Sequence, residues 1–218
     1  MHIVITGANR GIGKALADHY RAAGHRVTGT ARQPTGELIA LDVTDPTAHH
    51  AMAEQMGDQP VDLLICNAGV YPDRHETLEN GYPASMWAQA FATNVTGVFL
   101  SIQTLLPRIK AAKAAKAGKI AVISSQMASD TRAPGGSYIY RASKAAALNL
   151  GRNLAVDLAP SGVAVGIYHP GWVRTGMGGD GAAISVDEAA EGLVARFAEL
   201  DLASTGCFRT YDGQDHPY

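Results

Sequence analysis

Several kinds of residue are scarce in this chain, and the scarcity excludes some classes of protein. The 218 residues include only two cysteines, too few for the disulfide framework of a small secreted domain. Cys66 and Cys207 both lie in apolar, strand-like runs, which favours buried thiols in a reducing compartment. No apolar stretch approaches the ~20 residues of a membrane span. Met1 leads directly into the first apolar run and leaves no room for a signal peptide, so we expect a cytoplasmic protein without a membrane partner.

An excess of either charge is also absent. Lysine and arginine number 18, aspartate and glutamate 20, and the net charge of −2 implies no acidic partner such as nucleic acid. An alanine-rich stretch contains four regularly spaced lysines: Lys110, Lys113, Lys116 and Lys119. They could form a basic patch, but we favour a solvated helix end. The eight histidines show no metal-ligand spacing, so no metal is expected. Adjacent His49 and His50 are expected at the surface.

Hydrophobic residues make up 46% of the chain, enough for one α/β domain over residues 1–218 with a sizeable core. Short apolar runs alternate with helical patterns, which predicts a parallel sheet with helices on both faces. The strand-like runs are 2–6, 26–31, 37–41, 61–66, 118–124, 162–168 and 206–211. The helical patterns lie near 12–24, 45–56, 84–115, 138–159 and 186–200.

A glycine-rich turn joins the first strand to the first helix. The segment Thr6–Gly13 reads TGANRGIG and follows the apolar run His2–Ile5. Glycines at such a junction let the backbone approach a pyrophosphate, which rests on the N–H groups of the helix N-terminus. The spacing G-x-x-x-G-x-G differs from the G-x-G-x-x-G of many dinucleotide folds. Taken alone, this turn favours a dinucleotide site, and the alternative is a tight connection that binds no ligand.

Tyr140 and Lys144 lie one helical turn apart in a segment with a helical pattern. A phenol ordinarily loses its proton near pH ~10, and an adjacent ammonium group lowers that pKa. Such a tyrosine can give a proton to a carbonyl oxygen or take one from an alcohol. Tyr138 is the competing tyrosine, but it is off the helical face of Lys144.

Together these segments resemble the short-chain dehydrogenase/reductase family over nearly the whole chain. The turn residues Thr6, Gly7, Gly11 and Gly13 match the family's cofactor turn, and four further matches follow in order: Asn67-Ala68-Gly69, Asn94, Ser124-Ser125 and Pro170–Thr175. The resemblance implies a Rossmann-type, doubly wound parallel sheet of about seven strands in the order 3-2-1-4-5-6-7. It also implies a short substrate loop near 176–186.

The resemblance assigns roles to four residues. Tyr140 is implied as the proton donor, and Lys144 as the group that holds the nicotinamide ribose and keeps the tyrosine acidic. Ser125 would donate a hydrogen bond to the substrate carbonyl, and Asn94 would hold a water that links Lys144 to solvent. Ser124 competes with Ser125, but strand alternation sends the two side chains to opposite faces, and the family pattern favours Ser125.

Charge at the end of the second strand indicates the cofactor. NAD enzymes of this type carry an acidic residue there, whereas this chain has Arg32 and no carboxylate. Arg10 and Arg32 could both bind a 2′-phosphate, which favours NADPH over NADH; the alternative is two exposed surface arginines. The full expected cofactor-binding set is Thr6, Gly7, Asn9, Arg10, Gly11, Ile12, Gly13, Arg32, Asp42, Val43, Asn67, Ala68, Gly69, Tyr140, Lys144, Pro170, Gly171, Val173 and Thr175. Within it, Asn67 is expected mainly to brace backbone between strands.

Three local segments, 135–141, 169–179 and 211–213, resemble the C-factor and sniffer-type carbonyl reductases. The leading expectation is therefore an NADPH-dependent reductase of a ketone or aldehyde. A nucleotide-binding signalling protein of C-factor type is the alternative, and an epimerase or dehydratase ranks below both. Tyr71, Met127, Trp172 and Met177 are expected to line an apolar substrate pocket. The resemblance also implies a homodimer or homotetramer formed through the helices at 84–115 and 138–159.

Overall fold

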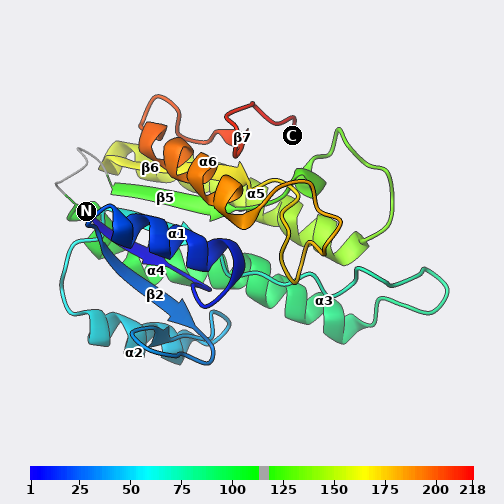
Figure 1. The fold of residues 1–218 in the computed structure, drawn as a ribbon, viewed down its shortest axis with the longest axis horizontal. Coiled ribbons are helices and arrows are strands. Elements are labelled where there is room, and N and C mark those ends of the chain that lie inside the picture. Colours follow the sequence, from blue (N-terminus) through cyan, green and yellow to red (C-terminus); the bar gives the residue numbers. More distant parts are fainter. Residues whose placement is uncertain (113–117) are drawn as a thin grey trace.

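The computed structural model describes residues 1–112 and 118–218, and its centre is one sheet of parallel strands (Figure 1). Seven strands follow the order β3-β2-β1-β4-β5-β6-β7, which confirms the predicted topology. Their bounds are β1 His2–Ile5, β2 Arg26–Ala31, β3 Ile39–Ala40, β4 Leu63–Cys66, β5 Gly118–Ile123, β6 Val163–His169 and β7 Phe208–Thr210.

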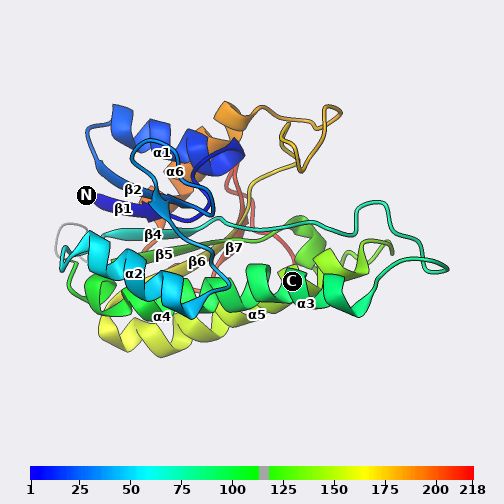
Figure 2. The same ribbon diagram turned by 90° about the horizontal axis from the view of Figure 1, so that it is seen from below.

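Helices cover both faces of the sheet (Figure 2). One face carries α1 (Gly11–Ala22) and α6 (Val186–Glu199), and the other carries α2 (Pro46–Met56), α4 (Gly97–Lys110) and α5 (Tyr138–Leu158). Because side chains alternate along a strand, Ile3 and Ile5 of β1 enter one core cluster while Val4 enters the other. Both faces of the central strands are therefore buried, as expected of a parallel sheet.

The register of the sheet brings the ends of four strands to one edge. Ile5 of β1 pairs with Ile65 of β4, and Cys66 pairs with Val122 of β5. Ile123, the last residue of β5, pairs with Tyr168 of β6. The segments that follow these strands therefore meet at the carboxyl edge, where ligands bind in open parallel sheets.

One helical run contradicts the expected absence of long apolar segments. Residues Ala84–Lys110 span 27 residues and include an 18-residue stretch with a mean hydropathy of 1.2, so the run is long and apolar enough by composition to cross a membrane. In the fold this run comprises α3 (Ala84–Phe91), a π-helical turn, η1 (Ala92–Thr96), and α4. Helix α4 buries Val98, Ile102, Leu105 and Ile109 in the core beneath the sheet. This packing accounts for the apolar character of α4.

Two expectations about polar residues are wrong. Lys119 is neither in a basic patch nor at a solvated helix end: it lies in β5, is buried, and donates to the carbonyls of Phe197 and Ala198 at the end of α6. His49 is not at the surface, because it lies on the buried face of α2 with Nε2 3.0 Å from the Val43 carbonyl oxygen. Lys113 and Lys116 lie outside the described residues.

Candidate active site

The glycine turn forms the first wall of the site, between β1 and α1. Gly7 and Gly11 have φ values of +68° and +53°, which favour glycine. A Cβ on Gly13 would overlap the Gly7 carbonyl oxygen and the Asn67 amide, so no larger residue fits at this position in the first turn of α1. Helix α1 has no side-chain cap at Arg10 and no acidic residue in its first turn. This arrangement fits the pyrophosphate of a dinucleotide.

Thr6 and Asn67 brace that turn from behind. The Thr6 hydroxyl accepts hydrogen bonds from the backbone N–H groups of Asn67 and Ala68, each at 3.0 Å. The Asn67 side-chain amide donates to the carbonyls of Thr6 and Gly7, also at 3.0 Å each. The bracing expected of Asn67 is thus present, and these contacts fix the end of β4 against the glycine turn.

Arg10, Arg32 and Asp42 are the residues expected at the adenosine end of the cofactor site. Both arginines are exposed, Arg10 at the start of α1 and Arg32 directly after β2. The Asp42 carboxylate accepts two hydrogen bonds from Thr44, and these bonds, helped by the charge of Arg32, hold the pKa of that carboxyl below its usual range. Of the other expected contacts near this end, Asn9 is exposed, while Val43 is buried against Gly97.

Helix α5 carries Tyr140 and Lys144, and both side chains are buried. The Lys144 ammonium lies 5.7 Å from the centre of the Tyr140 ring and donates to the Ile123 carbonyl at 2.9 Å. Ser125, which follows β5, interacts through its hydroxyl with the Tyr140 phenol. The structure therefore brings Tyr140, Lys144 and Ser125 together at the carboxyl edge of the sheet.

The expected lowering of the Tyr140 pKa by Lys144 is wrong for this structure. Burial raises the pKa of Tyr140 to about 12, and the nearby Ser125 hydroxyl only partly opposes this effect. Burial also lowers the pKa of Lys144 to about 8, since a charged ammonium loses its hydration there. Desolvation thus dominates at both groups, and Tyr140 is a neutral phenol at pH 7.

The two adjacent serines divide as strand alternation predicts. Ser124 is buried and donates to the Lys144 carbonyl at 3.0 Å, on the side where α5 packs. Ser125 has the opposite orientation, toward the phenol of Tyr140.

Asn94 lies in the π-helical turn η1 and is fully buried. Its amide accepts from the Val70 N–H and donates to the Val70 carbonyl and the Ser143 hydroxyl, each at 2.9 Å. A Cβ on Gly69 would lie 3.2 Å from Asn94 Oδ1 and 3.4 Å from Lys144 Nζ. Asn94 therefore joins η1, the segment after β4 and the catalytic helix next to the Lys144 ammonium.

The segment after β6 closes the site from the α6 side. Gly171 has φ of +90°, and a Cβ there would clash with Ile184 and Tyr211. Val173 is buried. A Cβ added to Gly11 would lie 3.5 Å from the Thr175 methyl group, so Thr175 is next to the glycine turn. Pro170 begins this segment directly after β6. Of the expected cofactor residues after β6, Thr175 thus lies against the glycine turn, while Gly171 packs against Ile184 and Tyr211.

Three residues after β4 belong to the site although sequence reasoning gave them little weight or none. The Tyr71 ring stacks on the Tyr140 ring, with centres 4.2 Å apart, and its hydroxyl lies 2.6 Å from the Ser137 hydroxyl. The Asp73 carboxylate accepts from the N–H groups of Ile139 and Tyr140, the second and third residues of α5. Arg74 donates to the carbonyls of Met177 and Gly178 in the expected substrate loop, at 3.0 and 3.4 Å. No local pattern announces Asp73 or Arg74, because their partners are 66 or more residues away.

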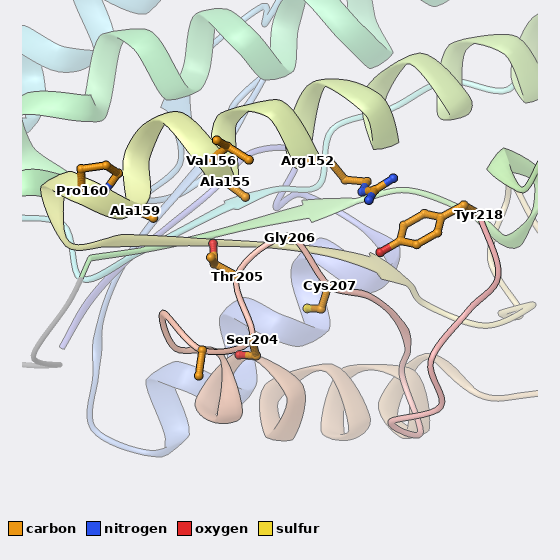
Figure 3. A pocket seen from close by; sticks show the side chains of 11 residues that line it. Arg152, Ala155, Val156, Ala159, Pro160, Ser204, Thr205, Gly206, Cys207 and Tyr218 are labelled. Carbon is orange, nitrogen blue, oxygen red and sulfur yellow. The ribbon is translucent and has the colours of Figure 1, made fainter.

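A large cavity lies elsewhere, at the β7 side of the molecule (Figure 3). Its volume is about 640 Å³, and its walls come from the second half of α5, the loop before β7 and Tyr218. The Arg152 guanidinium lies 3.9 Å from the centre of the Tyr218 ring at one end. None of the expected catalytic residues lines this cavity.

The fold and the buried tyrosine–lysine–serine group define a dinucleotide-binding oxidoreductase. A model of the short chain dehydrogenase family matches residues 1–183. The C-signal protein of Myxococcus xanthus is 32% identical over 168 residues, which cover 77% of this chain and 99% of that protein. The 3-oxoacyl-[acyl-carrier-protein] reductase FabG of Escherichia coli is 30% identical over 188 residues, covering 80% of this chain and 74% of that enzyme.

Solved carbonyl reductases share the whole fold. The NADPH-bound carbonyl reductase from chicken fatty liver superposes with a TM-score of 0.89 at 29% identity, covering 100% of this chain and 98% of that one. Carbonyl reductase Sniffer of D. melanogaster gives 0.91 at 26% identity, covering 100% and 99%. The chain therefore belongs to the short-chain dehydrogenase family and is an NAD(P)-dependent oxidoreductase of small molecules.

Proposed function

We propose that the protein reduces a ketone or aldehyde to an alcohol with NADPH as the hydride donor. The observation that carries this proposal is the neutral, buried phenol of Tyr140, which faces Ser125 and has Lys144 one turn further along α5. A phenol that keeps its proton at neutral pH suits the reductive direction, in which the protein must supply a proton.

Each of the four central residues has a separate task in this proposal. Bound NADPH supplies the hydride, and the protein supplies position and the proton. Tyr140 gives its proton to the oxygen of the carbonyl, while the Ser125 hydroxyl stabilises the charge that develops there. Lys144 has three N–H donors, one of which binds the Ile123 carbonyl, and the ammonium is assigned to the nicotinamide ribose. Asn94 keeps Lys144 connected to solvent through a water, so that the proton of Tyr140 is replaced.

The surrounding residues are assigned to the cofactor and the substrate. Arg10 and Arg32 bind the 2′-phosphate, which is why NADPH is favoured over NADH; their exposure and the fold shared with an NADPH-bound carbonyl reductase support this. The remaining cofactor residues are those that line the glycine turn, the ends of β3 and β4 and the segment after β6. Tyr71, Met127, Trp172 and Met177 line the substrate side, with residues 176–186 as its loop. Two free cysteines support a reducing, cytoplasmic setting, and α4 and α5 are the proposed dimer or tetramer faces.

The decisive test is oxidation of NADPH, followed by absorbance, against a panel of aldehydes, ketones, diketones and quinones. Tyr140→Phe keeps the ring and removes only the hydroxyl, so the rate should fall at least ~100-fold while NADPH still binds. Tyr138→Phe is the matched control and should cost little, because Tyr138 is 37% exposed and packs on Tyr82. Near wild-type turnover by Tyr140→Phe would refute the central assignment. A wild type that prefers NADH would refute the cofactor assignment.

The similarity to C-signal favours one other candidate, a nucleotide-binding signalling protein for which turnover is dispensable. The complete group of Tyr140, Lys144, Ser125 and Asn94 favours catalysis, since a protein that only binds nucleotide has no need of a proton donor. The same experiment separates the two candidates. Tight NADPH binding by the wild type, with no oxidation across the panel, would support the signalling role.

A further inference from the structure

The first turn of the catalytic helix has no cap from its own sequence. Ser137, which precedes α5, has a left-handed backbone with φ of 49°, and its side chain makes no capping hydrogen bond. No acidic residue lies in the first turn of α5. Four N–H groups at the start of a helix lack helical partners and require others, above all where the helix end is buried. Ile139 and Tyr140 are both buried there.

Asp73 supplies the missing partner from a distant part of the chain. Its carboxylate accepts from the Ile139 N–H at 2.8 Å through Oδ2. It also accepts from the Tyr140 N–H, at 3.2 Å through Oδ1 and 3.3 Å through Oδ2. The side chain is 1% exposed, so these bonds are shielded from water. A carboxylate at a helix N-terminus is also favoured by the helix dipole.

The neighbours of Asp73 lock the same turn. Tyr71, two residues earlier, stacks on the Tyr140 ring and bonds Ser137 through its hydroxyl. Arg74, the next residue, bonds the carbonyls of Met177 and Gly178 on the other side of the site. Asp73 therefore lies in the middle of a short segment that connects the end of β4 to the catalytic helix and to the substrate loop.

From these contacts we infer that Asp73 is a positioning residue for Tyr140: its carboxylate replaces the missing cap of α5 and fixes the turn that carries the phenol. The inference rests on the proposed reductase function for its consequence in catalysis. Asp73 does not touch the reacting atoms itself, and acts through the backbone N–H groups of Ile139 and Tyr140.

The negative charge of Asp73 has a second effect on Tyr140. The charged and titratable groups that face this phenol are Lys144 on α5 and Tyr71 and Asp73 on the segment after β4. Burial is the main cause of the raised pKa of Tyr140, and Tyr71 and Asp73 add to it. Replacing the carboxylate by a neutral amide should therefore lower the pKa of Tyr140.

The test compares Asp73→Ala and Asp73→Asn with Asp45→Ala. Asp45 caps α2 through the Thr47 N–H, is exposed and has no place in the proposed site, so its variant measures the loss of a cap alone. Amide hydrogen exchange should become at least ~10-fold faster at Ile139 and Tyr140 in Asp73→Ala, while Asp73→Asn retains part of the protection. The kcat of carbonyl reduction should fall at least ~10-fold in Asp73→Ala, with the Kd of NADPH unchanged.

The pH dependence separates positioning from simple structural support. In the reverse reaction, alcohol oxidation, Tyr140 must lose its proton, so the rising limb of the rate should move to lower pH in Asp73→Asn. Unchanged exchange at Ile139 and Tyr140 with an unchanged kcat in both variants would overturn the inference. An equal loss of kcat in Asp45→Ala would also overturn it. Failure of the reductase assignment would appear as a wild type that reduces no carbonyl in the panel. Failure of this inference would appear only in the Asp73 variants, as unchanged hydrogen exchange, and that measurement needs no substrate.

Discussion

Lys144 shows how burial sets the chemistry of a single residue. Because burial lowers its pKa to about 8, this lysine changes charge just above neutral pH in the protein without cofactor. Its proposed task, holding the nicotinamide ribose beside a phosphorylated cofactor, requires the charged form. Cofactor binding should therefore be coupled to the protonation of Lys144.

This coupling predicts the pH dependence of NADPH affinity. Below about pH 8 Lys144 is already charged, so the Kd of NADPH should not change with pH. Above about pH 8 binding must take up a proton, so the Kd should rise by up to ~10-fold per pH unit. Lys144→Met should bind more weakly at neutral pH and show no such slope. Lys110→Met, at the exposed end of α4, is the control and should behave as the wild type. Fluorescence titration between about pH 7 and 9.5 measures these constants, and an equal slope in Lys144→Met would contradict the assignment.

The four-residue spacing of Tyr140 and Lys144 could be predicted, whereas the direction of the Tyr140 pKa could not. The spacing is a local property of one helix, and the structure confirms that both residues lie on α5. The pKa depends on burial and on Tyr71 and Asp73, which reach the phenol from another part of the chain. A sequence reports which residues are helical neighbours, but it does not report how much water surrounds them.

At the scale of helices and strands, hydrophobic patterning was sufficient to locate the strands, whereas their order was predicted from the family resemblance. Each predicted strand-like run overlaps one of the observed strands, because short apolar runs between helical patterns are typical of parallel strands. In the described part of the predicted helix at 84–115, which excludes residues 113–115, two helices are joined by the π-helical turn that holds Asn94. The remote cap of α5 could not be predicted, because Asp73 and Ile139 are 66 residues apart in sequence.

Arg74 makes a testable connection between two such elements. Arg74 joins the segment after β4 to the expected substrate loop near 176–186 by donating to the Met177 and Gly178 carbonyls. The Trp172 indole also donates to the Gly178 carbonyl. Arg74→Ala should leave the loop less ordered at the mouth of the site, raising the KM for the carbonyl substrate about 3- to 10-fold, as expected for losing about 1 kcal/mol. The kcat should change little.

Arg141→Ala is the matched control for Arg74→Ala. Arg141 is also an arginine that donates to a loop carbonyl, that of Gly136, at 3.0 Å. Steady-state kinetics and hydrogen exchange over residues 172–181 should change in Arg74→Ala and not in Arg141→Ala. An unchanged KM in Arg74→Ala would show that the loop is held by Trp172 and its own turns.

For the whole molecule, the burial of several histidines predicts a loss of stability in acid. His169 ends β6, is 8% exposed, and has no partner for Nδ1 among the described residues. Its ring lies 6.0 Å from that of His216, in the C-terminal segment whose His216 N–H bonds the Phe208 carbonyl of β7. Burial, reinforced by His216, lowers the pKa of His169 to about 4. Burial also lowers the pKa values of His2 and His49.

The sign of the resulting pH dependence follows from proton uptake. Between about pH 6.5, the ordinary value, and about pH 4, the unfolded chain binds a proton at residue 169 that the folded protein does not, so acid favours unfolding. His169 alone should remove about 2 kcal/mol of the free energy of unfolding between pH 7 and pH 5. His169→Leu, which is similar in volume and cannot titrate, should lose correspondingly less stability over this range. His50→Gln, at an exposed position on α2, should lose as much as the wild type. Urea unfolding at the two pH values measures these differences, and an identical loss in wild type and His169→Leu would show that His169 is not among the groups that set the acid limit.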